Sequence, residues 1–186
     1  MHEYPLLFFF LVFVVAILLA EKSLLVLTFV FFMLGLFAHR FFSLFLKRLE
    51  WEHYDKVFIL PFGNNAYAVG NSILVGKSLL NEDKEIVDAI LMHELGHIRY
   101  RDFLTTFLFL VFLKLSTRFV ERKETLLFTL LFGMLFVWTY WHMEVRADMF
   151  AKAQGKNIEK ALERFSLRWR LAFVRGQELG DFQEKA

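Results

Sequence analysis

The chain has 186 residues, enough for one domain of ordinary size, and 57% of them are hydrophobic, including 25 phenylalanines. This composition is more apolar than a soluble domain of this length usually has, because a small core cannot bury so many apolar side chains. The formal net charge is only +2, which argues against a nucleic-acid partner. The absence of cysteine excludes disulfides, thiolate zinc sites and a cysteine nucleophile.

Four apolar runs divide the chain, at residues 5–20, 23–38, 103–120 and 125–141. A helix needs roughly 17 to 25 apolar residues to cross a bilayer, so each run is near the lower limit. Short charged turns at residues 21–22 and 122–124 join the runs in pairs. The sequence therefore predicts two transmembrane hairpins, within residues 1–38 and 103–141.

Two features of these runs leave alternatives open. The first run could be a cleaved signal peptide, but residues 1–5 carry neither lysine nor arginine and a second apolar run follows at once. In the third run, Lys114 and Arg118 lie one helical turn apart. Either that face turns to protein or water, or the segment is only partly inserted.

Basic residues near the ends of the runs predict an orientation. Only Lys22 follows the first run, whereas Arg40, Lys47 and Arg48 follow the second. This places residues 39–102 on the cytoplasmic side of the inner or plasma membrane. Residues 142–186 return to that side if the second hairpin crosses fully, although the basic residues at 118, 122 and 123 favour the opposite orientation.

The segment between the hairpins has a mixed pattern. Residues 40–50 alternate apolar and basic positions, which is typical of an interfacial helix. Residues 56–60, 65–70 and 72–76 are short, β-prone and separated by turn signals, so they predict a small sheet. Asn81 precedes an acidic stretch and is expected to cap a helix that runs to residue 100 or beyond.

The segment after the second hairpin, residues 142–186, is expected to be helical. Its apolar side chains recur at helical spacing, so we expect them to pack and the opposite basic face to be solvated. The residues of this apolar face are Ile158, Leu162, Phe165, Trp169 and Phe173.

The chemistry is carried by the motif H-E-x-x-H, formed by His93, Glu94 and His97. On a helix, two histidines four residues apart leave the same face and can bind one metal ion. Glu94 would then lie beside the water that such an ion binds. The helix predicted from Asn81 supplies the context that the motif needs.

A third protein ligand is available in the stretch "HMEVRAD". Glu144 and Asp148 are again four residues apart on one helical face. Glu144 would complete a site of two histidines and one glutamate, with a fourth position open for water. Asp148 would accept a hydrogen bond from a ligating imidazole and fix its tautomer. A hairpin that crosses and returns would bring Glu144 back to His93 and His97.

The remaining histidines, at positions 2, 39, 53 and 142, need no catalytic role. His142 is the open case, because it is close to Glu144 in sequence and could stabilise an oxyanion. A histidine beside Trp138, Tyr140 and Trp141 is, however, also typical of a membrane interface, and we favour that interpretation.

These motifs resemble those of the HtpX-type membrane zinc metallopeptidases, the family that also contains the CAAX prenyl endopeptidases. The similar stretches are "HELGHIRYRD", then "EVRADMFAKAQG" after two apolar segments, and upstream "NNAYAVGNSILVGKSLLNEDKEIVDAIL". Together they cover roughly residues 60–165. The hairpin between the motifs is shorter than in HtpX-type enzymes, and the tail lacks their His-Pro and Arg signature.

The resemblance implies one Zn²⁺ per chain, bound by His93, His97 and Glu144, with Glu94 as general base and Asp148 behind the ligands. It also implies that Asn65 and Ala66 lie on a strand along which an extended peptide docks by β-augmentation. The substrate implied is a membrane or misfolded protein, hydrolysed in protein quality control.

The expected fold is therefore a mainly α membrane protein with about four transmembrane helices in two hairpins. A small α+β zinc protease domain of the gluzincin type, with a short β-sheet, would be formed by residues 39–102 and 142–186. The expected function is a membrane-integral zinc endopeptidase whose site faces the cytoplasm, with a peptide or protein substrate and the lipid bilayer as partners.

Three alternatives stay open. The shorter hairpin is closer to the BlaR-type sensor metallopeptidases, although those typically have Cys where this chain has Ala147 and carry a large sensor domain. A non-catalytic metal-binding scaffold would not need Glu94, which is intact. An accidental motif would require Glu144 and Asp148 to be coincidences as well.

Overall fold

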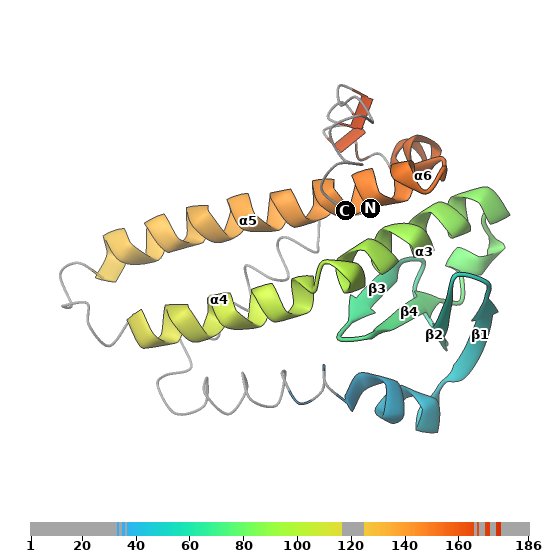
Figure 1. Ribbon diagram of the computed structural model, residues 1–186, viewed down its shortest axis with the longest axis horizontal. Coiled ribbons are helices and arrows are strands. Elements are labelled where there is room, and N and C mark those ends of the chain that lie inside the picture. The colour runs from blue at the N-terminus through green and yellow to red at the C-terminus, as the bar shows by residue number, and fades with distance from the viewer. Residues whose placement is uncertain are drawn as a thin grey trace.

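The computed structural model describes residues 33, 35, 37–116, 125–165, 167, 170, 171, 174 and 175. They form an α+β domain in which a four-stranded sheet packs against the helix that carries the H-E-x-x-H motif (Figure 1). The elements that follow helical residues 37–45 are β1 (Lys47–Trp51), β2 (Tyr54–Leu60), β3 (Ala66–Val69), β4 (Ser72–Gly76), the 3-10 turn η1 (Leu79–Asn81), α3 (Lys84–Arg99), α4 (Asp102–Ser116), α5 (Thr125–Ala153) and α6 (Ile158–Arg164).

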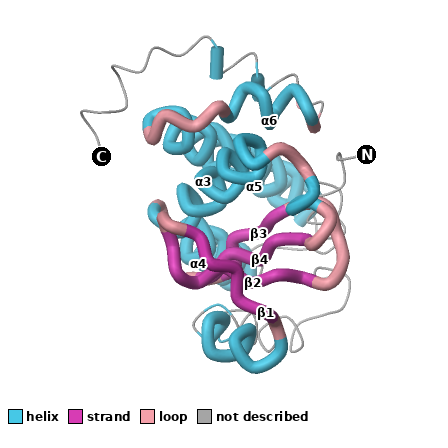
Figure 2. Tube along the Cα trace, turned by 90° about the vertical axis from the view of Figure 1, so that its right-hand side faces the viewer, coloured by secondary structure: helices cyan, strands magenta, loops and turns pink. Residues whose placement is uncertain are grey.

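The sheet is mixed and has the strand order β1-β2-β4-β3. β2 and β4 are parallel, whereas the two outer pairs are antiparallel. Helical residues 37–45 lie on one side of the sheet, and α3 with α5 lie on the other (Figure 2). All five residues of β4 are buried, because an inner strand covered on both faces has no polar side. β3 is left as an edge strand beside α3.

The predicted small sheet is confirmed at β2, β3 and β4, but the interfacial helix over residues 40–50 is only partly right. Helical backbone ends at residue 45, and residues 47–51 form β1, which pairs with β2. The reason is the two-residue period of this stretch, in which Leu49 and Trp51 pack against the core while Glu50 points to solvent.

The motif helix begins later than the sequence predicted. Asn81 ends the 3-10 turn η1, and α3 starts at Lys84 with Asp83 in the capping position. Leu79 is fully buried, so the turn before α3 is anchored by packing, and the polar residues that follow lie at its solvent side. The helix also ends slightly earlier than predicted, since α3 runs to Arg99 and Tyr100 is its C-cap.

The fold class predicted from the apolar runs, a mainly α membrane protein with about four transmembrane helices, is wrong. Among the described residues, no helix combines the length and apolar composition that crossing a bilayer requires. In the third and fourth runs, aromatic side chains of α4 and α5 pack on one another, with Phe109 4.4 Å from Phe132 between ring centroids. α5 then continues without a break into the helix that carries Glu144. The hydropathy of a run shows neither which helix it packs against nor whether its helix continues into a polar segment.

Several earlier predictions fall outside the described residues. Of the predicted first hairpin, only residues 33, 35, 37 and 38 are described, and residue 118 of the third run is not. In the C-terminal segment, Ile158 and Leu162 are buried as expected and Phe165 packs against the core, whereas Trp169 and Phe173 are not described.

Candidate metal centre

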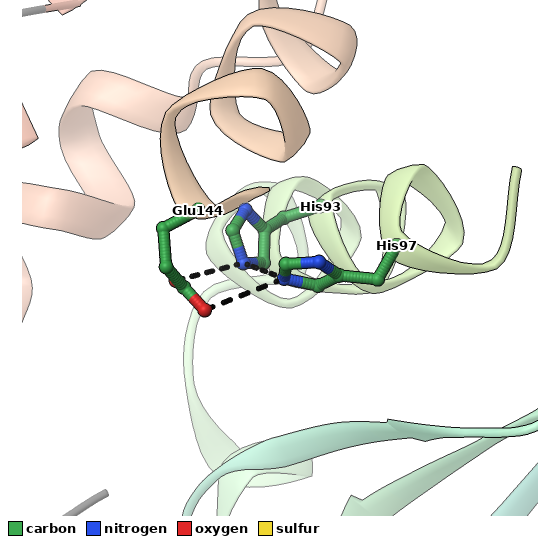
Figure 3. Close-up of side chains that lie close together, drawn as sticks. All are labelled: His93, His97 and Glu144. Carbon is green, nitrogen blue, oxygen red and sulfur yellow. Dashed lines mark hydrogen bonds and ion pairs between the residues drawn. The ribbon is translucent and has the colours of Figure 1, made fainter. Parts of the chain in front are cut away.

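Three potential ligands meet between α3 and α5. His93 and His97 leave the same face of α3, and their Nε2 atoms are 3.1 Å apart. Glu144 reaches them from α5, with Oε2 3.6 Å from Nε2 of His93 and Oε1 3.6 Å from Nε2 of His97 (Figure 3). One ligand atom from each residue lies within 4.8 Å of the others. The helical spacing of the histidines and the course of α5 thus produce the grouping expected from the sequence.

The distances between these atoms fit a tetrahedral metal ion. Zinc bonds of about 2.0–2.2 Å at tetrahedral angles separate neighbouring ligand atoms by about 3.3–3.6 Å. The two Nε2 atoms are 3.1 Å apart, and each is 3.6 Å from one oxygen of Glu144, Oε2 for His93 and Oε1 for His97, which is close to that range. Two imidazoles and a carboxylate are also a donor set typical of catalytic zinc, with one position left for water.

The other ring nitrogen of each histidine contacts an aspartate. Nδ1 of His93 is 2.8 Å from Oδ1 of Asp148, and Nδ1 of His97 is 2.7 Å from Oδ2 of Asp102. Because an ionised carboxylate only accepts, the hydrogen-bond network assigns the proton to each Nδ1. Both Nε2 lone pairs then converge on one point, an arrangement that a cation between them stabilises. Asp148 therefore lies where the sequence predicted.

The electrostatics of the site favour a bound cation. Burial lowers the pKa of His93, but Asp148 and Glu144 outweigh it and raise the pKa to about 10. Burial raises the pKa of Glu144, but Arg170 and the two imidazoles hold it well below its usual range. Asp148 and Glu144 therefore stay ionised, and a metal ion would take the place of the proton that their negative charge holds on His93.

Glu94 is buried and lines the same cleft as the three potential ligands. Its carboxylate accepts a hydrogen bond from the backbone N–H of Ala68 on the edge strand β3. Burial raises the pKa of Glu94, while His93 and His97 oppose the rise. The residue predicted as general base is thus held between the ligand helix and the strand.

Arg170 is a site residue that the sequence did not predict. The basic face of the C-terminal segment was expected to be solvated, but Arg170 is buried, with 9% of its surface exposed. Its Nη1 is 2.7 Å from Oε2 of Glu144, and its Nε donates to Asp148 at 2.7 Å. The sequence contained only an indirect indication of this role. Two buried carboxylates need a positive charge nearby, and this segment contains several basic residues.

Three further site residues received no role from the sequence, namely Asp102, Arg146 and Tyr140. Asp102 contacts His97 and accepts a hydrogen bond from Arg146. Tyr140, one helical turn before Glu144, lines the cleft and makes a side-chain hydrogen bond with Glu144. Asp102 follows the motif by five residues, a spacing that only the turn between α3 and α4 makes meaningful.

The remaining predicted residues lie in two different places. Asn65 and Ala66 line the same cleft of about 270 Å³ as the ligands, and Ala66 begins the edge strand β3. His142 is exposed and packs edge-on against Trp138 and Trp141, with ring centroids 4.4 and 4.9 Å away. It is not among the residues that line the cleft.

Comparison with known proteins adds a family. The family model described as peptidase family M48 matches residues 47–166, which span every strand, the motif helix, both predicted ligand segments and α6. Searches of curated proteins and of solved structures gave no significant match.

Proposed function

Since the chain belongs to peptidase family M48, and is therefore a metallopeptidase by family, we propose that it is a zinc-dependent endopeptidase of HtpX type. The observation that carries this proposal is the convergence of His93, His97 and Glu144, with Glu94 facing the same cleft. We propose cleavage of peptide bonds in unfolded or membrane proteins, as a step in protein quality control.

Zinc suits the donor set better than magnesium or calcium, which prefer oxygen ligands. Held by His93, His97 and Glu144, it would polarise the scissile carbonyl and lower the pKa of a bound water. Asp148 and Asp102 hold the two imidazoles with Nε2 directed at the ion's position. Their negative charge also makes the imidazoles better ligands.

Glu94 supplies the proton transfers in the proposed reaction. Its carboxylate takes a proton from the attacking water, whose oxygen forms the new bond to the scissile carbonyl carbon. When the C–N bond breaks, the same carboxyl group delivers that proton to the leaving amine. The hydrogen bond from Ala68 orients the carboxylate toward the strand along which the peptide would lie.

The edge strand β3 offers a backbone template for an extended substrate. The carbonyl of Asn65 accepts from the N–H of Gly76, so this residue faces β4. In an antiparallel pair the backbone groups alternate, which places those of Ala66 and Ala68 on the open edge. The Ala68 N–H serves Glu94, and we propose that the backbone groups of Ala66, which lines the cleft, pair with the peptide by β-augmentation.

Docking as an added strand requires an unfolded segment, which supports the proposed substrate class. The cleft also has apolar walls suited to apolar side chains, including Phe103, Phe136 and Met143. Further along α5, large apolar side chains are exposed, among them Leu130, Met134 and Trp138. We propose a lipid bilayer as the partner of this surface, at the cytoplasmic face of the inner or plasma membrane.

The test is the Glu94→Gln variant, assayed on casein and on an unfolded membrane protein, with zinc content measured by mass spectrometry. We expect zinc to stay bound and cleavage to be lost, because the amide keeps the shape but cannot accept the proton. Glu50→Gln, at an exposed position of β1, is the matched control and should cleave normally.

Three results would contradict the proposal. An unchanged cleavage rate in Glu94→Gln would exclude Glu94 as the base. Zinc binding without cleavage by the unaltered protein would instead favour the non-catalytic metal-binding scaffold. Loss of zinc from Glu94→Gln would indicate that Glu94 is itself a metal ligand, which the geometry described above does not predict.

A further inference from the structure

Each of the two ligand imidazoles is backed by its own aspartate and arginine. His93 contacts Asp148, which pairs with Arg170, and His97 contacts Asp102, which pairs with Arg146. We propose that Arg146 is a positioning residue, which holds Asp102 against His97 and thereby presents His97 to the metal. This inference rests on the proposed function, because it assigns a role within the same metal centre.

The turn between α3 and α4 places Asp102 beside His97. Tyr100 donates its backbone N–H to Gly96, and Arg101 donates to Ile98, so the end of α3 is closed. Arg101 then adopts a φ of 58°, which is uncommon for a residue other than glycine. The chain reverses into α4 at that point. Asp102 becomes the first residue of α4, with 5% of its surface exposed.

Arg146 binds this turn from α5, through the carboxylate oxygen of Asp102 that His97 does not contact. Its Nη2 donates to Oδ1 of Asp102, while Oδ2 of the same carboxylate receives the N–H of His97. Its guanidinium also lies over the ring of Tyr100, 4.4 Å from the centroid. Both oxygens of a buried carboxylate are therefore engaged, and its orientation is fixed from two directions.

The position of Arg146 in the sequence connects it to a second ligand. It lies two residues after Glu144 on α5, so the contact with Asp102 ties the helix that supplies Glu144 to the turn that orients His97. Arg170 does not replace it, because that side chain contacts Asp148 and Glu144 on the His93 branch. Loss of Arg146 should therefore disturb the His97 branch selectively.

The test is zinc affinity, measured by competition with a chromophoric chelator on the full chain. We compare Arg146→Gln, Arg146→Lys, Asp102→Ala and the double variant Asp102→Ala/Arg146→Gln, with folding checked by circular dichroism. Residues behind metal ligands are typically worth about 10- to 100-fold in affinity, so we expect about a tenfold loss for Arg146→Gln. The lysine variant should recover part of it, and Arg99→Gln, an exposed arginine of α3, should bind normally.

The double variant distinguishes an effect of Arg146 that acts through Asp102 from an effect that is independent of Asp102. If Arg146 acts through Asp102, the double variant should bind zinc no more weakly than Asp102→Ala alone. Additive losses, or normal affinity in Arg146→Gln, would overturn the inference. A second readout needs no metal: the Nδ1–H proton resonance of His97 should broaden by exchange in Arg146→Gln and stay sharp in Arg99→Gln. Failure of the unaltered protein to bind zinc would count against the proposed function, while this resonance still decides the role of Arg146.

Discussion

Gly96 and Ala147 touch where α3 crosses α5, and no side chain separates the two backbones. A Cβ atom added to Gly96 would lie 3.1 Å from the Cα and 3.3 Å from the Cβ of Ala147. Gly96 precedes the ligand His97, and Ala147 follows the ligand Glu144 by three residues. The close approach of the helices is therefore what brings ligands from two elements within reach of one ion.

The first prediction is that Gly96→Ala weakens the metal centre. Alanine is the better helix former by about 1 kcal/mol, but overpacking typically costs about 1–3 kcal/mol. We expect a net loss of stability of about 1 kcal/mol and weaker zinc binding, because α5 must move away from α3. Urea denaturation and zinc competition measure the two effects.

Gly133→Ala is the matched control on α5, since a Cβ at that position meets nothing within 4 Å. It should leave zinc affinity unchanged and stabilise the protein by up to about 1 kcal/mol, through helix propensity alone. Equal zinc affinity in both glycine variants would show that the crossing distance does not govern the site.

The second prediction concerns Arg170, the buried cation between Glu144 and Asp148. Arg170→Met would leave two buried carboxylates without their counter-charge, and breaking a buried ion pair typically costs about 3–5 kcal/mol. We expect a loss of this size in the free energy of unfolding of the metal-free protein. Zinc should restore part of the stability, because it supplies positive charge to Glu144. Chemical denaturation with and without zinc measures both quantities.

Arg175→Met is the control for Arg170→Met. It tests whether the loss of any arginine in this segment lowers stability in the same way. Arg175 pairs with Glu159 and Glu163 at the surface, where solvent screens the interaction. Its removal should change stability little and in a way that zinc does not reverse. A similar, zinc-independent loss in both variants would count against a role of Arg170 in the site.

The third prediction is that Tyr140, and not His142, donates to the oxyanion of the reaction, by turning its O–H toward the substrate from Glu144, to which it donates in this structure. Burial raises the pKa of Tyr140, and Glu144 adds to the effect, so the phenol keeps its proton. We expect Tyr140→Phe to lower kcat by about 10²–10³, the usual cost of losing one such donor, with KM nearly unchanged. Steady-state kinetics on a peptide substrate measure this split.

His142→Ala decides between the two candidates. The imidazole is exposed and packs edge-on against Trp138 and Trp141, so its loss should leave kcat close to that of the unaltered protein. The opposite result, a large loss in His142→Ala and none in Tyr140→Phe, would return the role to the histidine that the sequence suggested.

The parts of the site that sequence could predict are those that one helix sets by itself. His93 and His97, like Glu144 and Asp148, are four residues apart, and helical geometry alone puts each pair on one face. Asp102, Arg146 and Arg170 escape this reasoning. Their contacts depend on a turn, on the crossing of two helices and on a segment distant in sequence. None of these produces a regular spacing in the sequence.

The fold was harder to predict for a related reason. An apolar run shows how much surface must be buried, but not whether protein or lipid buries it. The sequence therefore could not distinguish the packing of Phe109 on Phe132 from contact with lipid. β1 was missed because its two-residue alternation follows directly on a helical stretch rich in phenylalanine. The strands around Ile73 were predictable, since they are short, apolar and bounded by turn residues.

The last prediction is the pH dependence of cleavage through Glu94. Burial raises the pKa of this carboxyl group above its ordinary value of 4.5, although His93 and His97 oppose the rise. The base works only when ionised, so protonation removes activity as the pH falls. The acid limb of kcat/KM should therefore have its midpoint above 4.5, and activity should be complete on its alkaline side. Because acid also competes with the metal for its ligands, the profile is measured at two zinc concentrations, both saturating. A limb that moves with zinc concentration would report the ligands instead, and a zinc-independent midpoint at or below 4.5 would contradict a buried base.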